Sequence, residues 1–381
     1  MKKIICFFIV LCIGLSGITV LAEGEDLKLS AKSALLMEAS TGEILYEMEP
    51  DKELPIASVT KIMTMLLIME EIDSGRLSLD DMVSVSENAM SYGGSTMFLE
   101  TGEQLSVNDM MKGIAVASAN DGCVAMAEHI AGSETAFVDK MNERAKELGM
   151  EHTHFMNTNG LDEDNHYSSA RDVAIMSREL IKHEKIFDYT TIWTDELRGG
   201  KFMLANTNKL IRYYNGANGL KTGSTSKALC CLSASAKRDD MQLIGVILGA
   251  PTSAERFDSA KTLLDYGFSH YNVKKLISKG DSFEPAEVKK GIEENVGVMA
   301  GEDCSVLIEK ANSNEIEQKI TVDENLTAPI EANSEIGKIT FTCGGKTVGE
   351  VPLLAAYTVD KKSIGNIILE FLKTIMYGKI E

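Results

Sequence analysis

Two residues at the start of a long apolar segment have the types that serine acyl-transfer chemistry needs. Ser58 and Lys61 are three positions apart, and residues at that spacing share one face of a helix. A serine hydroxyl is a weak nucleophile that needs an adjacent base. A lysine at its ordinary pKa is neutral only about once in 2,500 at pH 7, so it acts as that base only where its surroundings lower the pKa. The apolar run 62–67 predicts such a buried setting.

Two later motifs carry side chains suited to the same reaction. Ser118 and Asn120 lie in a predicted helical region, where a second hydroxyl can relay a proton and an amide can hold a substrate carbonyl. Lys221, Thr222 and Gly223 lie at the start of a predicted strand. There a cation and a hydroxyl can hold a carboxylate, and glycine lets a ligand approach the backbone. Each motif alone is consistent with a helix cap or an ordinary turn, but the three together predict one acyl-transfer site.

Hydrophobic periodicity predicts the elements that must position these motifs. Residues 33–48 are typical of a hairpin, and 58–72 of a deeply buried helix. Further helices are predicted over 105–131, 134–148, 170–183 and 253–266, and strands over 228–236 and 241–248. Strands at both ends with helices between them predict an α+β domain. In it, one antiparallel sheet is assembled from both ends and a helical region is inserted.

The character of the chain changes near residue 273. Short β-rich runs separated by turns follow at 296–299, 304–308, 317–322, 339–343 and 347–351. They predict a small all-β domain over 273–358. In the final segment, 360–381, apolar residues recur on one helix face with lysines around it. We expect an amphipathic helix that lies in a membrane interface, and a terminal helix docked on its own protein is the alternative.

The first 22 residues are typical of a secretory signal peptide. Lys2 and Lys3 precede the apolar run 4–20, and Ala22 supplies a small residue where a signal peptidase can cut. An uncleaved anchor is the alternative, and with either one the rest of the chain lies outside the cytoplasm. We expect residues 23–270 to form the domain that carries the three motifs.

Charge and cysteine content exclude other classes of function. The formal net charge of −19 argues against nucleic-acid binding, which needs a basic surface. Five cysteines follow the predicted signal peptide. Their odd number, the adjacent pair Cys230 and Cys231 and the lack of CxxC spacing predict buried free thiols instead of a disulfide framework or a zinc site. We expect no metal and no cofactor.

The motifs together resemble those of the penicillin-recognising serine enzymes, and among them the low-molecular-weight D-alanyl-D-alanine carboxypeptidases. The segments that carry the resemblance are 55–64, 117–121, 157–161, 166–172, 206–210 and 219–225. The family usually has glycine where Ala119 stands. The resemblance implies a β-lactamase/transpeptidase-like domain followed by a small β domain. It also implies a tail that holds the enzyme at the outer face of the cytoplasmic membrane.

The resemblance also implies roles for the first two motifs. Ser58 would attack the bond between the two terminal D-alanines of a peptidoglycan stem peptide, and Lys61 would take its proton. Ser118 and Asn120 would assist proton transfer and place the substrate. Water would then release the acyl-enzyme, whereas β-lactams would acylate Ser58 and leave slowly.

For the third motif, the resemblance implies substrate binding. Lys221 and Thr222, beside Gly223, would hold the terminal carboxylate. The oxyanion would rest on backbone N–H groups, those of Ser58 and of a residue on the strand after Gly223, such as Ser226.

Other functions remain possible on the sequence alone. A β-lactamase or a D,D-endopeptidase would use the same site, but no Glu-x-x-Leu-Asn stretch lies between the second and third motifs to activate water for fast deacylation. A non-catalytic muropeptide or antibiotic sensor is disfavoured by the intact Ser58, Lys61 and Lys221. A Ser-His-Asp hydrolase would need a Gly-x-Ser-x-Gly turn, which is absent around any candidate serine.

Overall fold

The computed structural model describes residues 26–312 and 316–365, together with the single positions 368, 372 and 375. The predicted signal peptide lies outside these residues, as does most of the predicted C-terminal helix, so both stay predictions. Within the described ranges, no helix combines the length and the hydrophobicity that crossing a bilayer requires.

A five-stranded antiparallel sheet organises the first domain, in the order β2-β1-β9-β8-β7. Its strands are β1 (Ser33–Glu38), β2 (Ile44–Met48), β7 (Ala217–Thr225), β8 (Leu229–Arg238) and β9 (Met241–Ala250). The first hairpin of the chain therefore pairs with the last strand of the sheet through the β1–β9 contact, which confirms the predicted assembly from both ends. Because β7 is an edge strand, one of its backbone edges is free to meet another element.

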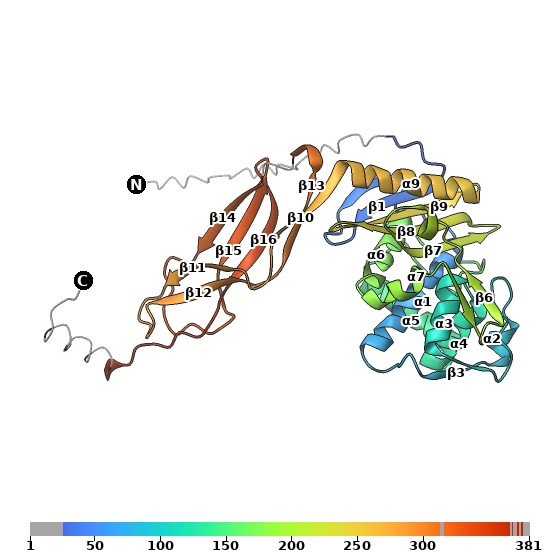
Figure 1. The fold of residues 1–381 in the computed structure, drawn as a ribbon, viewed down its shortest axis with the longest axis horizontal. Coiled ribbons are helices and arrows are strands. Elements are labelled where there is room, and N and C mark those ends of the chain that lie inside the picture. Colours follow the sequence, from blue (N-terminus) through green and yellow to red (C-terminus); the bar gives the residue numbers. More distant parts are fainter. Residues whose placement is uncertain (1–25, 313–315, 366–367, 369–371, 373–374, 376–381) are drawn as a thin grey trace, which may run out of the picture.

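Helices cover both faces of this sheet (Figure 1). The helix α9 (Ser253–His270) packs on one face against β8 and β9, and α6 (Ala170–Leu180) packs on the other against β9 and β1. The remaining helices are η1 (Ala57–Thr60), α1 (Lys61–Asp73), α2 (Glu87–Ser91), α3 (Val107–Val116), α4 (Asn120–Ala131), α5 (Glu134–Glu147), η2 (Glu184–Ile186), α7 (Phe187–Thr190) and α8 (Leu210–Tyr213). Two small two-stranded sheets complete the domain: β3 (Met82–Ser84) pairs with β4 (Gln104–Ser106), and β5 (Thr194–Leu197) pairs with β6 (Phe202–Ala205) in a hairpin.

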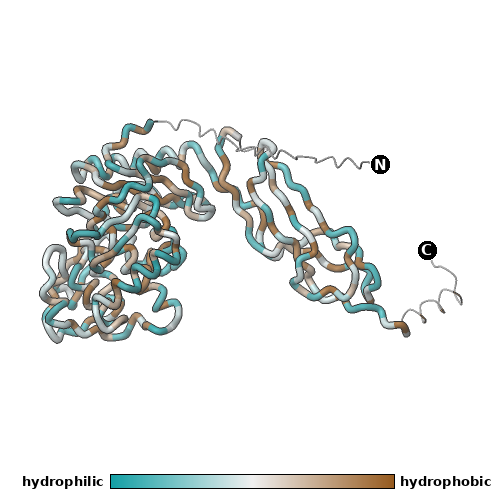
Figure 2. Tube along the Cα trace, turned by 180° about the vertical axis from the view of Figure 1, so that it is seen from behind, coloured by the Kyte–Doolittle hydropathy of each residue, from teal (hydrophilic) through white to brown (hydrophobic). Residues whose placement is uncertain are grey.

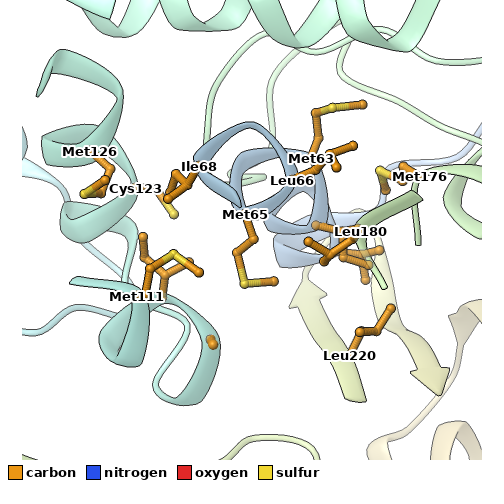
Figure 3. Packing of buried hydrophobic residues seen from close by; sticks show 14 of the residues in the cluster. Met63, Met65, Leu66, Ile68, Met111, Cys123, Met126, Met176, Leu180 and Leu220 are labelled. Carbon is orange, nitrogen blue, oxygen red and sulfur yellow. The ribbon is translucent and has the colours of Figure 1, made fainter. Parts of the chain in front are cut away.

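The helix α1 lies at the centre of the helical layer, as its apolar circumference predicts. Met63, Met65 and Leu66 are fully buried. Figure 3 shows these side chains between α4, which contributes Cys123, and α6, which contributes Leu180. Burying a side chain of this size stabilises the fold by about 1.5–3 kcal/mol, so the packing holds the N-terminus of α1 firmly in place.

The structure corrects three local predictions in this domain. The predicted helix 105–131 is two helices, because Ser118 takes a left-handed φ of 64° between α3 and α4. Ser58 lies on the 3₁₀ turn η1, and α1 begins only at Lys61. Lys221, Thr222 and Gly223 lie inside β7 instead of at its start.

The C-terminal domain is built from strands alone, apart from one 3₁₀ turn, η3 (Lys310–Asn312), within the described residues. A five-stranded sheet has the order β11-β12-β16-β15-β14, and β10 pairs with β13. The bounds are β10 (Tyr271–Ile277), β11 (Ser282–Glu287), β12 (Asn295–Ala300), β13 (Cys304–Glu309), β14 (Ile316–Val322), β15 (Glu335–Cys343) and β16 (Lys346–Ala355). Hydrophilic and hydrophobic positions alternate along its strands (Figure 2), which places residues such as Val296, Ile339 and Phe341 in an apolar core.

No disulfide joins the five cysteines in the described part of the chain. Cys123, Cys231 and Cys304 are buried, but Cys230 and Cys343 are only half-buried, so the prediction of burial is wrong for those two.

Candidate active site

The side chain of Lys61 is the centre of a buried polar cluster. It is fully buried, and its Nζ donates hydrogen bonds to Ser58 Oγ at 2.9 Å, to Asn120 Oδ1 at 2.7 Å and to the Asn159 carbonyl at 2.7 Å. Burial lowers the pKa of Lys61 to about 8. At pH 7 about one molecule in ten then holds a neutral amine. The first motif therefore pairs a serine hydroxyl with an amine that can accept its proton.

Two glycines let neighbouring segments close around Ser58. Gly223 of β7 faces η1 so closely that a Cβ there would lie 2.8 Å from the Ser58 backbone nitrogen. Gly160 has a φ of +86°, and a Cβ there would lie 1.9 Å from the Ala57 carbonyl oxygen. Both positions exclude side chains. The edge strand β7 and the loop 157–161 thereby form two walls directly beside the hydroxyl.

Ser118 and Asn120 form a third wall where α3 gives way to α4. Asn120 is the first residue of α4; its Nδ2 donates to the Gly93 carbonyl at 2.8 Å and its backbone N–H donates to the Ser95 carbonyl at 2.7 Å. These bonds aim Oδ1 at Lys61. Ser118 is buried in the turn before it, and among the described residues no hydrogen bond joins Ser118 to Ser58 or Lys61. The left-handed backbone at Ser118 rules out a simple helix cap there.

The second lysine of the cluster is held on β7. Lys221 is 1% exposed and its Nζ donates to the Thr222 carbonyl at 3.0 Å. Its pKa is lowered by burial and by the nearby Lys61 cation. An arriving carboxylate would oppose both effects, which makes this amine a suitable anion partner. Thr222 Oγ1 donates to Thr207 Oγ1 at 2.6 Å, so Thr207 adds a second hydroxyl at this end.

The structure corrects the predicted position of Ser226, which does not lie on the strand. The strand β7 ends at Thr225, and Ser226 lies in the exposed turn after it with its hydroxyl 3.4 Å from Asp162 Oδ2. Backbone groups of a strand alternate between its two edges. Since the Thr222 carbonyl accepts from Lys221, its backbone faces the free edge, and Ser224 two residues on faces the same edge. Ser224 therefore fits the role of oxyanion donor better than Ser226.

His166 stabilises the site from behind and does not reach the nucleophile. Its Nδ1 accepts from the Met156 backbone N–H at 3.0 Å, so Nε2 carries the proton and bonds Thr60 Oγ1 at 2.8 Å. Burial lowers the pKa of His166 to about 4, so the ring is neutral at pH 7. Among the described residues, no histidine contacts Ser58, which leaves a Ser-His-Asp triad without support.

Sequence reasoning missed two groups of the cluster. The Asn159 carbonyl and the Thr207 hydroxyl both lie in segments that the family resemblance includes, but neither has a local signature. A buried asparagine flanks Thr207 on each side. This Asn-x-Asn pattern is the feature of the sequence that could have pointed to Thr207 as part of the site.

A half-buried serine beside a buried lysine, enclosed by an asparagine on a helix and a lysine on an edge strand, defines a penicillin-recognising serine enzyme. The family model described as D-alanyl-D-alanine carboxypeptidase matches residues 19–252. A model described as the penicillin-binding protein 5 C-terminal domain matches residues 271–361. The chain therefore belongs to the D-alanyl-D-alanine carboxypeptidase family.

Several named relatives are similar to the chain over most of its length. It is 44% identical to the D-alanyl-D-alanine carboxypeptidase DacF of Bacillus subtilis, which covers 92% of this chain and 90% of the relative. It is 35% identical to DacC of Escherichia coli, with 88% and 86% covered. The crystal structure of penicillin binding protein 5 from Haemophilus influenzae superimposes with a TM-score of 0.78 at 32% identity, over 87% of this chain and 98% of that one.

Proposed function

We propose that this protein is a serine-type D-alanyl-D-alanine carboxypeptidase that removes the terminal D-alanine of peptidoglycan stem peptides through an acyl-enzyme on Ser58. One observation carries the proposal: the Lys61 amine lies 2.9 Å from Ser58 Oγ in a buried setting that lowers its pKa to about 8. The names of the relatives and the match to the family model support the same activity.

The geometry suggests how acylation proceeds. Neutral Lys61 accepts the hydroxyl proton as Ser58 Oγ attacks the carbonyl carbon of the penultimate D-alanine. The backbone N–H groups of Ser58 and Ser224 stabilise the oxyanion, and Asn120 orients the substrate.

The bond to the terminal D-alanine then breaks. Its nitrogen takes a proton from Lys61 through the Ser118 hydroxyl. Lys221, Thr222 and Thr207 hold the carboxylate of this leaving residue. Water attacks the ester in a second step and regenerates Ser58.

Mass spectrometry after β-lactam treatment tests the nucleophile. We expect one adduct on the peptide that contains Ser58, absent in Ser58→Ala, together with release of D-alanine from a stem-peptide mimic by the wild type alone. No adduct, or one on another residue, would refute the assignment. A solved relative, penicillin-binding protein D2 of Listeria monocytogenes, is described in an ampicillin-bound form; it is 33% identical over 63% of this chain and 98% of that one, with a TM-score of 0.58.

The kinetics of β-lactam consumption distinguish a carboxypeptidase from a β-lactamase. A carboxypeptidase consumes a chromogenic cephalosporin in a stoichiometric burst and then slowly, because the acyl-enzyme persists. Rapid steady-state turnover would instead identify a β-lactamase.

We also propose that the protein is secreted and attached to the outer face of the membrane by its C-terminal segment. Ile364, Ile368, Leu372 and Ile375 are 78%, 54%, 49% and 64% exposed, at a spacing that places them on one helix face. Their exposure favours a membrane partner over docking on the protein itself. Co-sedimentation with anionic lipid vesicles, with and without residues 360–381, tests this attachment; equal sedimentation of both forms would refute it.

A further inference from the structure

The segment Ser95–Leu99 is held rigidly to the start of α4. Both carboxylate oxygens of Asp121 accept from the Met97 backbone N–H at 3.0 Å, and one also accepts from the Leu99 N–H at 3.1 Å. Asn120, the neighbouring residue, donates its backbone N–H to the Ser95 carbonyl at 2.7 Å. The segment therefore belongs to the wall of the cleft that carries Asn120.

The side chain of Met97 strengthens this attachment. A Cβ on Gly113 of α3 would lie 1.7 Å from Met97 Sδ, and a Cβ on Gly122 of α4 would lie 2.9 Å from its Cε. Met97 thus fills the space that side chains on the two helices would occupy. The segment cannot shift without disturbing the packing between α3 and α4.

The β5–β6 hairpin is held by hydrogen bonds to β7, the strand that forms the opposite wall of the cleft. Directly after β6, Asn206 Oδ1 accepts from the Asn208 backbone N–H at 2.8 Å, and Asn208 Nδ2 donates to the Gly219 carbonyl on β7 at 2.9 Å. Thr207, between these two buried asparagines, contacts Thr222 at 2.6 Å. The hairpin therefore belongs to the wall that binds the substrate carboxylate.

One side chain joins the two walls. Arg198, in the turn between β5 and β6, donates from Nη1 to the Met97 carbonyl at 2.9 Å and from Nη2 to the Phe98 carbonyl at 3.4 Å. Its Nε and Nη2 also donate to the two carboxylate oxygens of Glu103 at 2.6 and 2.9 Å. Each partner of this ion pair is only 20% exposed, so solvent screens it weakly. A second ion pair, Lys112–Asp195, joins α3 to the base of the same hairpin at 2.8 Å.

The backbone around this contact is strained. Arg198 has a φ of 55° and Phe98 a φ of 53°, both in the left-handed region that side chains rarely adopt. Ala57 and Ser118, beside the nucleophile, are left-handed as well. Such strain persists where surrounding contacts enforce it, and it is concentrated at functional sites.

We propose that Arg198 is a positioning residue for the reaction: it ties the wall that carries Asn120 to the wall that carries Thr222 and so sets the width of the cleft. The inference rests on the proposed carboxypeptidase activity. Ser58 lies on η1 and Lys61 on α1, outside both walls, so loss of Arg198 leaves the nucleophile and its base in place. What changes is the distance between the group that orients the scissile carbonyl and the group that holds the carboxylate. A misplacement of about 1 Å at such groups costs on the order of 100-fold in rate.

Four forms of the full mature chain test the proposal: wild type, Arg198→Ala, Arg198→Lys and Arg144→Ala. Arg144 is the matched control, because it also joins elements through carboxylates (Glu70 at 2.8 Å and Glu179 at 3.0 Å) and is 22% exposed, but these partners lie on α1 and α6, away from the cleft. Each form is assayed for kcat and KM on a peptide ending in D-Ala-D-Ala, for its rate of acylation by penicillin, and for Tm.

We expect Arg198→Ala to lower kcat/KM about 10- to 100-fold, with KM raised and kcat lowered. Arg144→Ala should keep wild-type kinetics at temperatures below its Tm. Arg198→Lys should recover part of the loss, because lysine can pair with Glu103 but cannot bond both carbonyls at once. Wild-type kinetics in Arg198→Ala, or an equal loss in Arg144→Ala, would overturn the proposal. Absence of D-alanine release by the wild type would instead refute the proposed function, and the acylation rates would still report on Arg198.

Discussion

The two domains differ in what they bury. Among the described residues, every buried polar or charged side chain lies between Ser33 and Ser259, and none lies in the C-terminal domain. The core of that domain consists of aliphatic residues, one phenylalanine and one cysteine. Burial of a polar group without full compensation destabilises a protein. Among the described residues, this destabilisation is thus confined to the domain that carries the reactive cluster.

Lys61 and Phe341 illustrate the difference. Both side chains are almost completely removed from solvent, Lys61 at the N-terminus of α1 and Phe341 on β15. Burial of the amine opposes folding while the amine is charged, and gives it the lowered pKa that a base needs. Burial of the phenyl ring only stabilises.

The largest effect is expected from Lys61→Met, which keeps an unbranched side chain at the buried position but removes the base. D-alanine release should fall at least about 10³-fold, whereas Tm should stay equal or rise because no buried cation remains to be desolvated. In the wild type, kcat/KM should rise with pH and level off above about pH 8, because only the neutral amine accepts the proton of Ser58. Steady-state kinetics and calorimetry check both results. A fully active Lys61→Met variant would contradict the assignment.

The opposite pattern, a loss of stability with unchanged activity, is expected from Phe341→Ala. Truncation of a buried phenylalanine costs about 3–5 kcal/mol, so the C-terminal domain should unfold at lower denaturant concentration while D-alanine release stays unchanged. Ile320→Ala, at a position 43% exposed on β14, is the control and should change the free energy of unfolding by less than about 0.5 kcal/mol. Loss of activity in Phe341→Ala would show that the two domains are not energetically separate.

A smaller effect is expected from acid. The pKa of His166 is about 4 in the folded protein, below its ordinary value of 6.5, so the unfolded chain binds the proton more tightly. The contribution of His166 is therefore fully present above about pH 6.5 and is lost as the pH falls toward 4, by up to about 3 kcal/mol. Denaturant titrations of the wild type and of His166→Gln from pH 7 to 4 isolate this contribution. Parallel stability curves for the two proteins would rule it out.

The smallest effect is expected at the surface of the C-terminal domain. Lys338 and Glu350 form an ion pair at 3.0 Å between β15 and β16, with side chains about half exposed. Exposed pairs of this kind contribute about 0–1 kcal/mol, so Lys338→Met should shift the unfolding midpoint slightly and only at low salt. A loss comparable to that of Phe341→Ala would contradict the view that the apolar core carries the stability of this domain.

Much of the fold could be predicted because its signals are local. The alternation in 33–48 and 241–248, the apolar circumference of 58–72 and the turn-separated β runs after 273 are read over a few residues each. The predicted elements differ from the observed ones where a tertiary contact overrides a local sequence pattern. The helical pattern of 105–131 is continuous in sequence, but the left-handed Ser118 interrupts it at the wall of the cleft that carries Asn120.

The sequence by itself determined which chemistry is possible here: a serine and a lysine three residues apart on a buried apolar segment, with an asparagine and a second lysine to follow. Only the tertiary structure decided how that chemistry is made to work. Asn159, 98 residues from Lys61, supplies a carbonyl to its amine, and Thr207 places a second hydroxyl beside Thr222. The physical reason is that hydrogen bonds and desolvation depend on distance in space. Groups that are far apart in sequence leave no local pattern of the contacts they make.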